Sequence, residues 1–243
     1  TTPEVKVRTI RNKTVWVEIK LHQLVKEGRV QGLTATLDNI DDRKKAEEKL
    51  QHLALHDTLT GLYNRYYFDN ELNRMTLLAS RGNETHCLLY IDLDHFKIIN
   101  DTEGHQMGDL VLKEVAQILT LRLRNSDILC RVGGDEFVIL LSETKLRDAI
   151  EIGNNICDQI ANAHFQFGNT TYKVSASIGV SEIDGQATAA EYLRQADIAL
   201  YVAKNKGRNQ THSFVEGDTE STKQLDNMKW VQRLQQAIID DNL

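Results

Sequence analysis

Two aspartates interrupt the apolar segment LYIDLD, residues 89–94. Side chains alternate along an extended strand, so Tyr90, Asp92 and Asp94 are expected to share one face of it. Two carboxylates this close repel each other unless a cation lies between or near them. Mg²⁺ prefers hard oxygen ligands, takes few carboxylates from a protein and leaves positions for phosphate oxygens. The spacing therefore predicts a magnesium site at the end of a strand.

A second acidic pair follows two glycines in RVGGDEFVIL, residues 131–140. A Gly133-Gly134 loop suits a type I′ hairpin turn, which needs a positive φ at both loop residues. Glycines also let a planar base or a phosphate approach the backbone, because no side chain stands in the way. Asp135 and Glu136 would then lie at the hairpin tip.

The two acidic segments are most informative together. If the hairpin lies beside the strand at 87–94, Asp135 can complete a metal site with Asp92. Taken alone, the hairpin is well explained as a solvated tip with its charges pointing outward, because Gly-Gly-Asp turns are common. The presence of Asp92 weakens that alternative.

The composition limits the class of partner. The 243-residue chain has 41% hydrophobic residues, a net charge of −6 and a pI of about 5.8. This balance argues against a nucleic-acid surface, which needs an excess of Lys and Arg, but a nucleotide needs only a local cluster of donors. No apolar run of about 18 residues is present, so no membrane contact is expected within this chain. The three cysteines have no metal-ligand spacing, which favours reduced thiols in a cytosolic protein.

The first part of the chain differs from the rest. Residues 5–40 alternate as three short strands, and three strands alone bury too little to form a good core. We therefore expect the end of a β-rich module that starts upstream, in a chain cut from something longer. Residues 41–56 are highly charged, with a narrow apolar stripe of Ala46, Leu50 and Leu53 at helical spacing. This pattern predicts a linker helix or a short coiled coil.

From residue 57 onward, helical and extended segments follow one another. Helices are predicted at 64–80, 108–124, 146–163, 189–206 and 219–240, and strands at 87–94, 127–132, 135–141, 171–183 and 212–215. The βαββαβ order predicts an α+β fold, a sandwich of the ferredoxin-like, nucleotidyl-cyclase type. In it, helices flank a central, mostly antiparallel sheet, and the β fragment and linker helix precede it.

Several motifs, in order, resemble those of the GGDEF domains, which are diguanylate cyclases of bacteria. The resemblance covers roughly residues 50–215. It runs through DTLTGLYNR (57–65), DLDHFKIIND (92–101), GHQMGD (104–109), RVGGDEF (131–137), SIGVS (177–181) and ADIALYVAKNKGRN (196–209). So many ordered motifs do not arise together by chance.

The resemblance implies that two GTP molecules are joined into cyclic di-GMP, with release of two pyrophosphates. The 3′-hydroxyl of each GTP would attack the α-phosphate of the other, assisted by Mg²⁺ or Mn²⁺. Asp92, Asp135 and the carbonyl of Leu93 would hold the metal, and Glu136 would act as a catalytic residue near the metal or the attacking hydroxyl. One domain holds one GTP, so the active unit would be a two-fold homodimer with facing sites.

The resemblance also implies substrate contacts. Asn100 and Asp109 would bind the guanine edge, which carries both donors and an acceptor. Without the motif, these two residues would be interpreted as a turn residue and a helix cap. The remaining substrate-binding residues are Phe96, Lys97, Gly133, Gly134, Lys204 and Arg208. Their three cations would neutralise the triphosphate, although isolated lysines are by default solvated.

A second binding site is implied upstream of the hairpin. Arg124 and Asp127 form an RxxD pattern at the position of the family's product-inhibition site, where cyclic di-GMP would bind. An arginine can donate to guanine O6 and N7, and an aspartate can accept from guanine N1 and N2. The alternative is an exposed loop ion pair, worth under about 1 kcal/mol.

The resemblance implies a division of the chain into four parts. Residues 1–40 are similar to the last strands of a PAS domain, and 41–56 form a linker helix that would set the pairing of the homodimer. Residues 57–217 are the GGDEF domain. Residues 218–243 resemble the lead-in to an EAL phosphodiesterase domain, so the longer protein could both make and break cyclic di-GMP.

Two other functions stay open. The first is a catalytically weak regulatory domain that binds GTP or cyclic di-GMP within a bifunctional GGDEF–EAL protein. Loss of Asp92, or of the acids after Gly134, would indicate such a domain, and all of them are present. The second is an interaction module made of a PAS-type fragment and a dimerising helix. We expect a cytoplasmic bacterial protein, and membrane association of the longer protein is left open.

Overall fold

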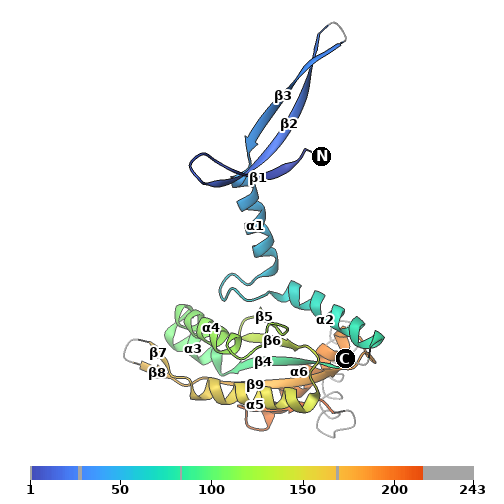
Figure 1. Ribbon diagram of the computed structural model, residues 1–243. Helices are drawn as coiled ribbons and strands as arrows, with labels where there is room; N and C mark the ends of the chain where they lie inside the picture. Colours follow the sequence, from blue (N-terminus) through green and yellow to red (C-terminus); the bar gives the residue numbers. More distant parts are fainter. Residues whose placement is uncertain (1, 27–28, 83, 168–169, 216–243) are drawn as a thin grey trace, which may run out of the picture. The chain divides into compact units, whose positions relative to one another are not determined.

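The computed structural model describes residues 2–26, 29–82, 84–167 and 170–215. The chain divides into two compact units, Thr1–Ala54 and Leu55–Leu243 (Figure 1). The helix expected at 219–240 lies outside the described residues, so the EAL prediction stays a prediction. None of the described helices combines the length and the apolar character that crossing a membrane requires.

The first unit is a small antiparallel sheet followed by a helix. The sheet has the order β1-β2-β3, from β1 (Glu4–Arg8), β2 (Thr14–Lys26) and β3 (Arg29–Asn39), and α1 (Asp41–Leu55) comes next. Among its described residues, Val17 and Ile40 are the only hydrophobic side chains that are buried, while Leu33 is 67% exposed. The sheet therefore forms with very little core of its own, as expected for three strands alone, although β2 and β3 are longer than the short strands that were predicted.

The second unit is built on one five-stranded sheet, which confirms the α+β fold. Its strands are β4 (His86–Asp94), β5 (Ile128–Gly133), β6 (Glu136–Leu141), β9 (Ser175–Ile183) and β10 (Thr211–Ser213). Their order is β10-β9-β4-β6-β5, and only the β10–β9 pair is parallel. A separate pair, β7 (Phe165–Phe167) and β8 (Thr170–Tyr172), extends the unit.

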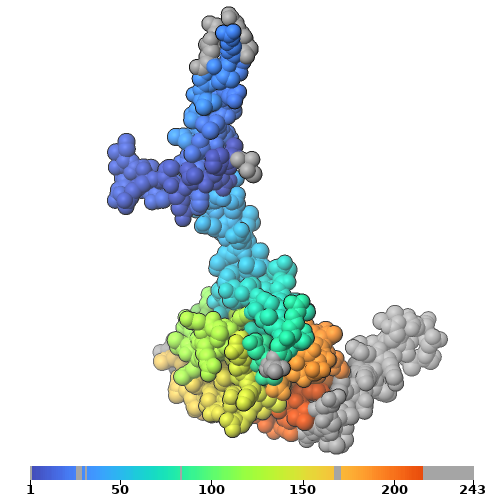
Figure 2. All heavy atoms as spheres, turned by 45° about the vertical axis from the view of Figure 1, so that its right-hand side comes forward, coloured from blue at the N-terminus to red at the C-terminus, as the bar shows by residue number. Residues whose placement is uncertain are grey.

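Helices cover both faces of this sheet because β4 is apolar on both sides. Leu89 and Ile91 belong to the core under α4 (His105–Thr120) and α5 (Leu146–Asn162). Leu88 belongs to the opposite core, under α2 (Arg65–Arg81) and α6 (Ala189–Asn205). Figure 2 shows α2 in turquoise beside the orange α6 segment. The central strands are thus held rigidly at the end where Asp92 lies.

One predicted helix and one predicted strand differ clearly from the structure in their bounds. The helix expected at 108–124 begins at His105 and ends at Thr120, and a further short helix, α3 (Phe96–Glu103), precedes it. Gly104 separates the two helices with a φ of +84°. The strand expected at 171–183 is divided into β8 and β9, and β7 was not predicted. Such short elements carry too few residues for their periodicity to show.

The hairpin loop lies one residue later than predicted. Gly133 still pairs with Glu136, because a bulge between Arg131 and Gly133 shifts the register of β5 against β6. The loop is therefore Gly134-Asp135, and of its two residues only Gly134 has a positive φ, at +41°. The type I′ prediction is wrong, since a single positive φ at the first loop residue is what a type II′ turn requires.

Candidate active site

The acidic segments meet because β4 and β6 pair along their length. Asp92 lies directly across from Glu136 in the antiparallel register. The N–H of Leu93 donates to the carbonyl oxygen of Asp135 at 3.3 Å, so the hairpin loop stays beside the end of β4. The structure thus brings the predicted metal ligands and Glu136 to one edge of the sheet.

A cavity of about 190 Å³ opens at this edge. Seven of the predicted site residues line it: Asp92, Leu93, Phe96, Lys97, Asp135, Lys204 and Arg208. Asp94 and His95 complete the lining, and both were absent from the predicted site. Carboxylate, ammonium and guanidinium groups thus line one cavity, as a site for a metal-bound phosphate would require.

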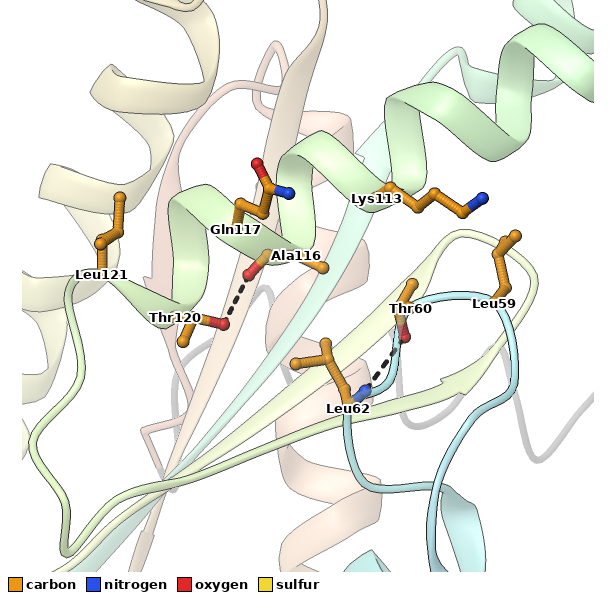
Figure 3. A pocket seen from close by; sticks show the side chains of 8 residues that line it. All are labelled: Leu59, Thr60, Leu62, Lys113, Ala116, Gln117, Thr120 and Leu121. Carbon is orange, nitrogen blue, oxygen red and sulfur yellow. Dashed lines mark hydrogen bonds between the residues drawn. The ribbon is translucent and has the colours of Figure 1, made fainter. Parts of the chain in front are cut away.

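Larger hollows exist away from the acids. The hollow in Figure 3, about 510 Å³, lies between α4 and the loop that carries Leu59 and Leu62. Lys113 is the one charged residue in its lining. We place the chemistry in the smaller cavity, because three aspartates and three cationic side chains line it together, and volume alone says nothing about chemistry.

Lys204 contacts the first of the predicted metal ligands. Its Nζ lies 2.7 Å from Oδ1 of Asp92, and both side chains are partly buried. Burial raises the pKa of Asp92, and the nearby carboxylates of Asp135 and Asp94 raise it further. The hydrogen bond and the charge of Lys204 act in the opposite direction. An additional cation here would therefore stabilise the ionised carboxylate.

Glu136 lies in a similar environment. Burial raises the pKa of its carboxyl group, and the charges of Asp92 and Asp135 raise it further. A hydrogen bond from Tyr90 partly offsets this effect. Asp197 of α6 also raises the pKa of Glu136, so the helix contributes a further carboxylate to the region. The sequence prediction missed Tyr90 and Asp197, although Asp197 lies within the ADIALYVAKNKGRN motif.

Asp94 is neutralised by different partners from those of Asp92. Its buried carboxylate accepts hydrogen bonds from the hydroxyls of Ser175 and Ser177, both at 2.7 Å, and from the backbone N–H of Asn209 at 3.1 Å. Nε of Arg208 lies 4.0 Å away. Arg208 and Asn209 have φ values of +65° and +47°, so Asp94 holds a turn in an uncommon backbone conformation. A cation shared with Asp92 was expected to balance the charge of Asp94, but these hydroxyl, N–H and guanidinium groups already do so.

The hairpin loop is fixed by Arg131, which the sequence prediction also missed. Its Nε and Nη2 donate to the carbonyl oxygen of Gly134 at 3.0 and 2.7 Å. Its Nη1 donates to both carboxylate oxygens of Asp57, at 3.0 and 3.1 Å. Burial acts to raise the pKa of Asp57, but hydrogen bonds from Thr60 and Arg131 outweigh it and lower the pKa. Asp57 lies in the DTLTGLYNR motif and Arg131 in the RVGGDEF motif, and this was the sequence signal that could have identified them.

The predicted guanine ligands lie at the junction of α3 and α4. A β-carbon on Gly108 would lie 1.9 Å from Oδ1 of Asn100 and 3.0 Å from Cζ of Phe96. The two helices can approach this closely only because residue 108 is a glycine. Asn100 therefore lies against Gly108, and Asp109 is the next residue of α4. Neither Asn100 nor Asp109 lines the 190 Å³ cavity.

The predicted product-inhibition residues lie in a turn. Oδ2 of Asp127 accepts a hydrogen bond from the backbone N–H of Arg124 at 2.9 Å, and Oδ1 accepts one from the N–H of Ser142 at 3.4 Å. Arg124 is exposed, and both residues line a hollow of about 330 Å³. Part of the hydrogen-bonding capacity of Asp127 is thus already used by the backbone.

The fold and this cavity define the class: an α+β sandwich whose acidic sheet edge faces a group of cations, as in proteins that act on metal-bound phosphates. The chain belongs to the family described as diguanylate cyclase, GGDEF domain, which matches residues 54–210. The structural neighbours have the same GGDEF fold.

Known proteins of this family are similar over most of the second unit. The chain is 38% identical over 178 residues to the probable diguanylate cyclase DgcE of Escherichia coli, covering 73% of this chain and 16% of DgcE. It is 34% identical over 223 residues to the bifunctional diguanylate cyclase/cyclic di-GMP phosphodiesterase MucR of Pseudomonas aeruginosa, covering 91% of this chain and 32% of MucR. The chain therefore spans only a minor part of these two curated relatives.

A solved structure is similar as well. The coiled coil and GGDEF domain of DgcB from Caulobacter crescentus, in complex with c-di-GMP, aligns with a TM-score of 0.68 and 29% identity. The alignment covers 72% of this chain and 93% of the DgcB chain.

Proposed function

We propose that this protein is a diguanylate cyclase that condenses two GTP molecules into cyclic di-GMP and releases two pyrophosphates. The observation that carries the proposal is the cavity at the end of β4, which Asp92, Leu93 and Asp135 line together with Lys97, Lys204 and Arg208. Family membership and the similarity to DgcE support the same reaction.

The donor set fits a hard divalent cation, and the family is divalent-metal dependent. Asp92, Asp135 and the carbonyl of Leu93 would hold Mg²⁺ or Mn²⁺. Among the residues that the structure describes, no three acidic, histidine or cysteine side chains converge as a preformed metal centre. Mg²⁺ does not require one, since it commonly binds through one or two carboxylates, water and substrate phosphates. When bound, it would stabilise charge on the attacking and leaving oxygens.

The protein's own groups would orient the substrate. Lys97, Lys204 and Arg208 would neutralise the triphosphate, and Asn100 with Asp109 would bind the guanine edge. The exposed backbone at Gly133 and Gly134 would let the nucleotide lie close to the chain, and Phe96 would line the cavity beside it. Each of these contacts positions the α-phosphate at the acidic edge of the sheet.

Glu136 is suited to a role near the attacking 3′-hydroxyl or the metal. Its raised pKa makes it a better proton acceptor than a solvated glutamate, and its hydrogen bond to Tyr90 would fix its orientation. The product carries two guanosine units, whereas the cavity lined by Asp92 and Asp135 would hold the reacting phosphate of one GTP. We therefore include a homodimer with facing sites in the proposal, with α1 as the element that would set the pairing.

Three finer points belong to the same proposal. Arg124 and Asp127 would bind cyclic di-GMP as an inhibitor, from the hollow that they line. The three-stranded first unit would be the end of a PAS domain, and an EAL domain would follow the chain, as the bifunctional name of MucR suggests. The protein would act in the bacterial cytoplasm. A purely regulatory domain has less support, because all the acids of the cavity are present.

The test is a turnover experiment. The purified protein is incubated with GTP and Mg²⁺, and the products are resolved by chromatography. The expected result is cyclic di-GMP from the unchanged protein and none from Asp135→Ala. Asp148→Ala, which removes a half-exposed aspartate on α5, is the matched control and is expected to keep full activity. A product peak that persists in Asp135→Ala would refute the assigned site, and no product from any variant would refute the activity.

A further inference from the structure

We propose that Lys204 occupies the place of the metal cation in the nucleotide-free protein, and that the triphosphate releases Asp92 to the metal by drawing Lys204 away. The inference rests on the proposed function. It adds that the triphosphate draws Lys204 away before Asp92 binds the metal. Its starting point is the 2.7 Å separation between Nζ of Lys204 and Oδ1 of Asp92. An ammonium at that distance occupies the oxygen that a divalent cation would use.

The three cations of the cavity differ in their partners. Lys204 forms an ion pair with Asp92, and its side chain is 30% exposed. Arg208 is near Asp94, at 4.0 Å, and Asp94 is not a predicted ligand. Lys97 is exposed, and none of the ion pairs found among the described residues includes it. Lys204 is thus the one cation of the cavity that contacts a predicted metal ligand.

The architecture keeps Lys204 close to this position. It lies in the last turn of α6, whose buried residues Ala196 and Leu200 pack on the sheet face that also carries Leu88 of β4. The helix is therefore fixed relative to Asp92, while the flexible side chain of a lysine can still swing by several ångströms. A movement of this size is sufficient to exchange a carboxylate for a phosphate oxygen bound in the same cavity.

Electrostatics makes the exchange depend on the nucleotide. A metal ion that enters alone must break the Lys204–Asp92 pair and then lie beside a displaced ammonium, which repels it. A triphosphate gives Lys204 a new anionic partner, so the repulsion is removed and the carboxylate becomes available. Metal and nucleotide should therefore each increase the affinity for the other by the same factor.

The consequence concerns how substrate is admitted. Free divalent cations would compete poorly for Asp92, and the cavity would be charge-balanced while it is empty. GTP that already carries its metal would bring the phosphates and the cation together. Lys204 would then have two successive partners, the carboxylate before binding and the phosphates after it.

The experiment measures Mn²⁺ binding to nucleotide-free protein, by the electron paramagnetic resonance signal of free Mn²⁺. Lys204→Met is expected to raise the Mn²⁺ affinity about tenfold, because the competing cation is gone. Lys97→Met, which removes an equal charge from the same cavity, is expected to change it less than about twofold. Lys204→Arg retains a cation and should stay near the unchanged protein. If Lys204→Met does not fold, Lys204→Gln takes its place.

A second measurement adds an α,β-methylene analogue of GTP, which cannot release pyrophosphate. The analogue should raise the Mn²⁺ affinity of the unchanged protein strongly and that of Lys204→Met much less. Equal increases in Lys204→Met and Lys97→Met without nucleotide would mean that only the overall charge matters and would overturn the proposal, as would no increase in either. Cyclic di-GMP production by the unchanged protein separates this failure from failure of the proposed function.

Discussion

Arg131 joins Asp57 to the hairpin that carries Asp135. Nη1 donates to both oxygens of the Asp57 carboxylate, at 3.0 and 3.1 Å, and the same guanidinium donates through Nε and Nη2 to the carbonyl oxygen of Gly134. The two side chains are 13% and 20% exposed, so water competes only weakly for these bonds. The residue that begins the second unit's first loop therefore fixes the loop that carries Asp135.

Asp57→Asn should destabilise the protein and reduce its activity. The substitution removes the charge and half of the paired hydrogen bonds, so the free energy of unfolding should fall by about 1–3 kcal/mol. Turnover should fall more than the affinity for GTP, because Asp135 is displaced rather than lost. Urea unfolding followed by circular dichroism measures the first effect, and steady-state kinetics measures the second.

The control for this prediction is Arg147→Gln, which removes an ion pair whose arginine is 92% exposed. Such a pair contributes little, so the unfolding free energy should change by less than about 0.5 kcal/mol. If Asp57→Asn is as stable and as active as Arg147→Gln, the hydrogen bonds that join Asp57 to the hairpin through Arg131 contribute to neither stability nor activity.

Asp94→Asn tests the turn that carries Arg208. The amide keeps one acceptor oxygen but cannot accept from both serine hydroxyls and from the N–H of Asn209 in the same way. Arg208 would then be placed less well toward the triphosphate. We expect KM for GTP to rise about tenfold and kcat to change less than about threefold. Asp158→Asn, an exposed change on α5, should leave both constants unchanged, and an equal loss in kcat would show that Asp94 acts on the chemistry itself.

The convergence of Asp92 with Asp135 could be predicted from the sequence only on the condition that the hairpin lies beside the strand at 87–94. Strand alternation places Asp92 at the end of one face, and a two-residue hairpin places Asp135 beside a neighbouring strand. The pairing of Arg131 with Asp57 spans 74 positions along the chain. It depends on how the loop before α2 packs against β5, which no local pattern encodes.

Two other differences depend on how strands pair with each other. The hairpin loop begins at Gly134 and not at Gly133 because a β-bulge adds one unpaired residue to β5, and a bulge is defined by the pairing with the neighbouring strand. The role of Asp94 depends on Ser175 and Ser177, which reach it only through the antiparallel register of β9 against β4. A register between strands far apart in sequence cannot be obtained from either strand alone.

Arg124→Ala should loosen product inhibition without loss of the active site. Arg124 is exposed and would donate to the guanine of cyclic di-GMP, so its removal should raise the inhibition constant about tenfold. The initial rate at low product should stay the same. Arg122→Ala removes a nearby exposed arginine that bonds Gln159 and serves as the control. Inhibition that is unchanged in Arg124→Ala, or equally loosened in both variants, would exclude the assigned site.

His86 should make the protein sensitive to mild acid. Its ring is buried, Nδ1 accepts from the N–H of Glu143 at 3.0 Å, and Nε2 has no hydrogen-bond partner among the described residues. Burial lowers the pKa of His86, although the charges of Glu84 and Glu143 oppose this. The unfolded chain therefore binds a proton first as the pH falls. The contribution of His86 to stability is complete above about pH 6.5 and is lost as the pH falls toward the lower folded pKa.

The test follows Tm across about 2.5 pH units, from pH 7.5 to pH 5. His86→Gln should make the fall in Tm over this range smaller, while the exposed His164→Gln should not. Parallel Tm curves for all three proteins would show that His86 does not control this transition.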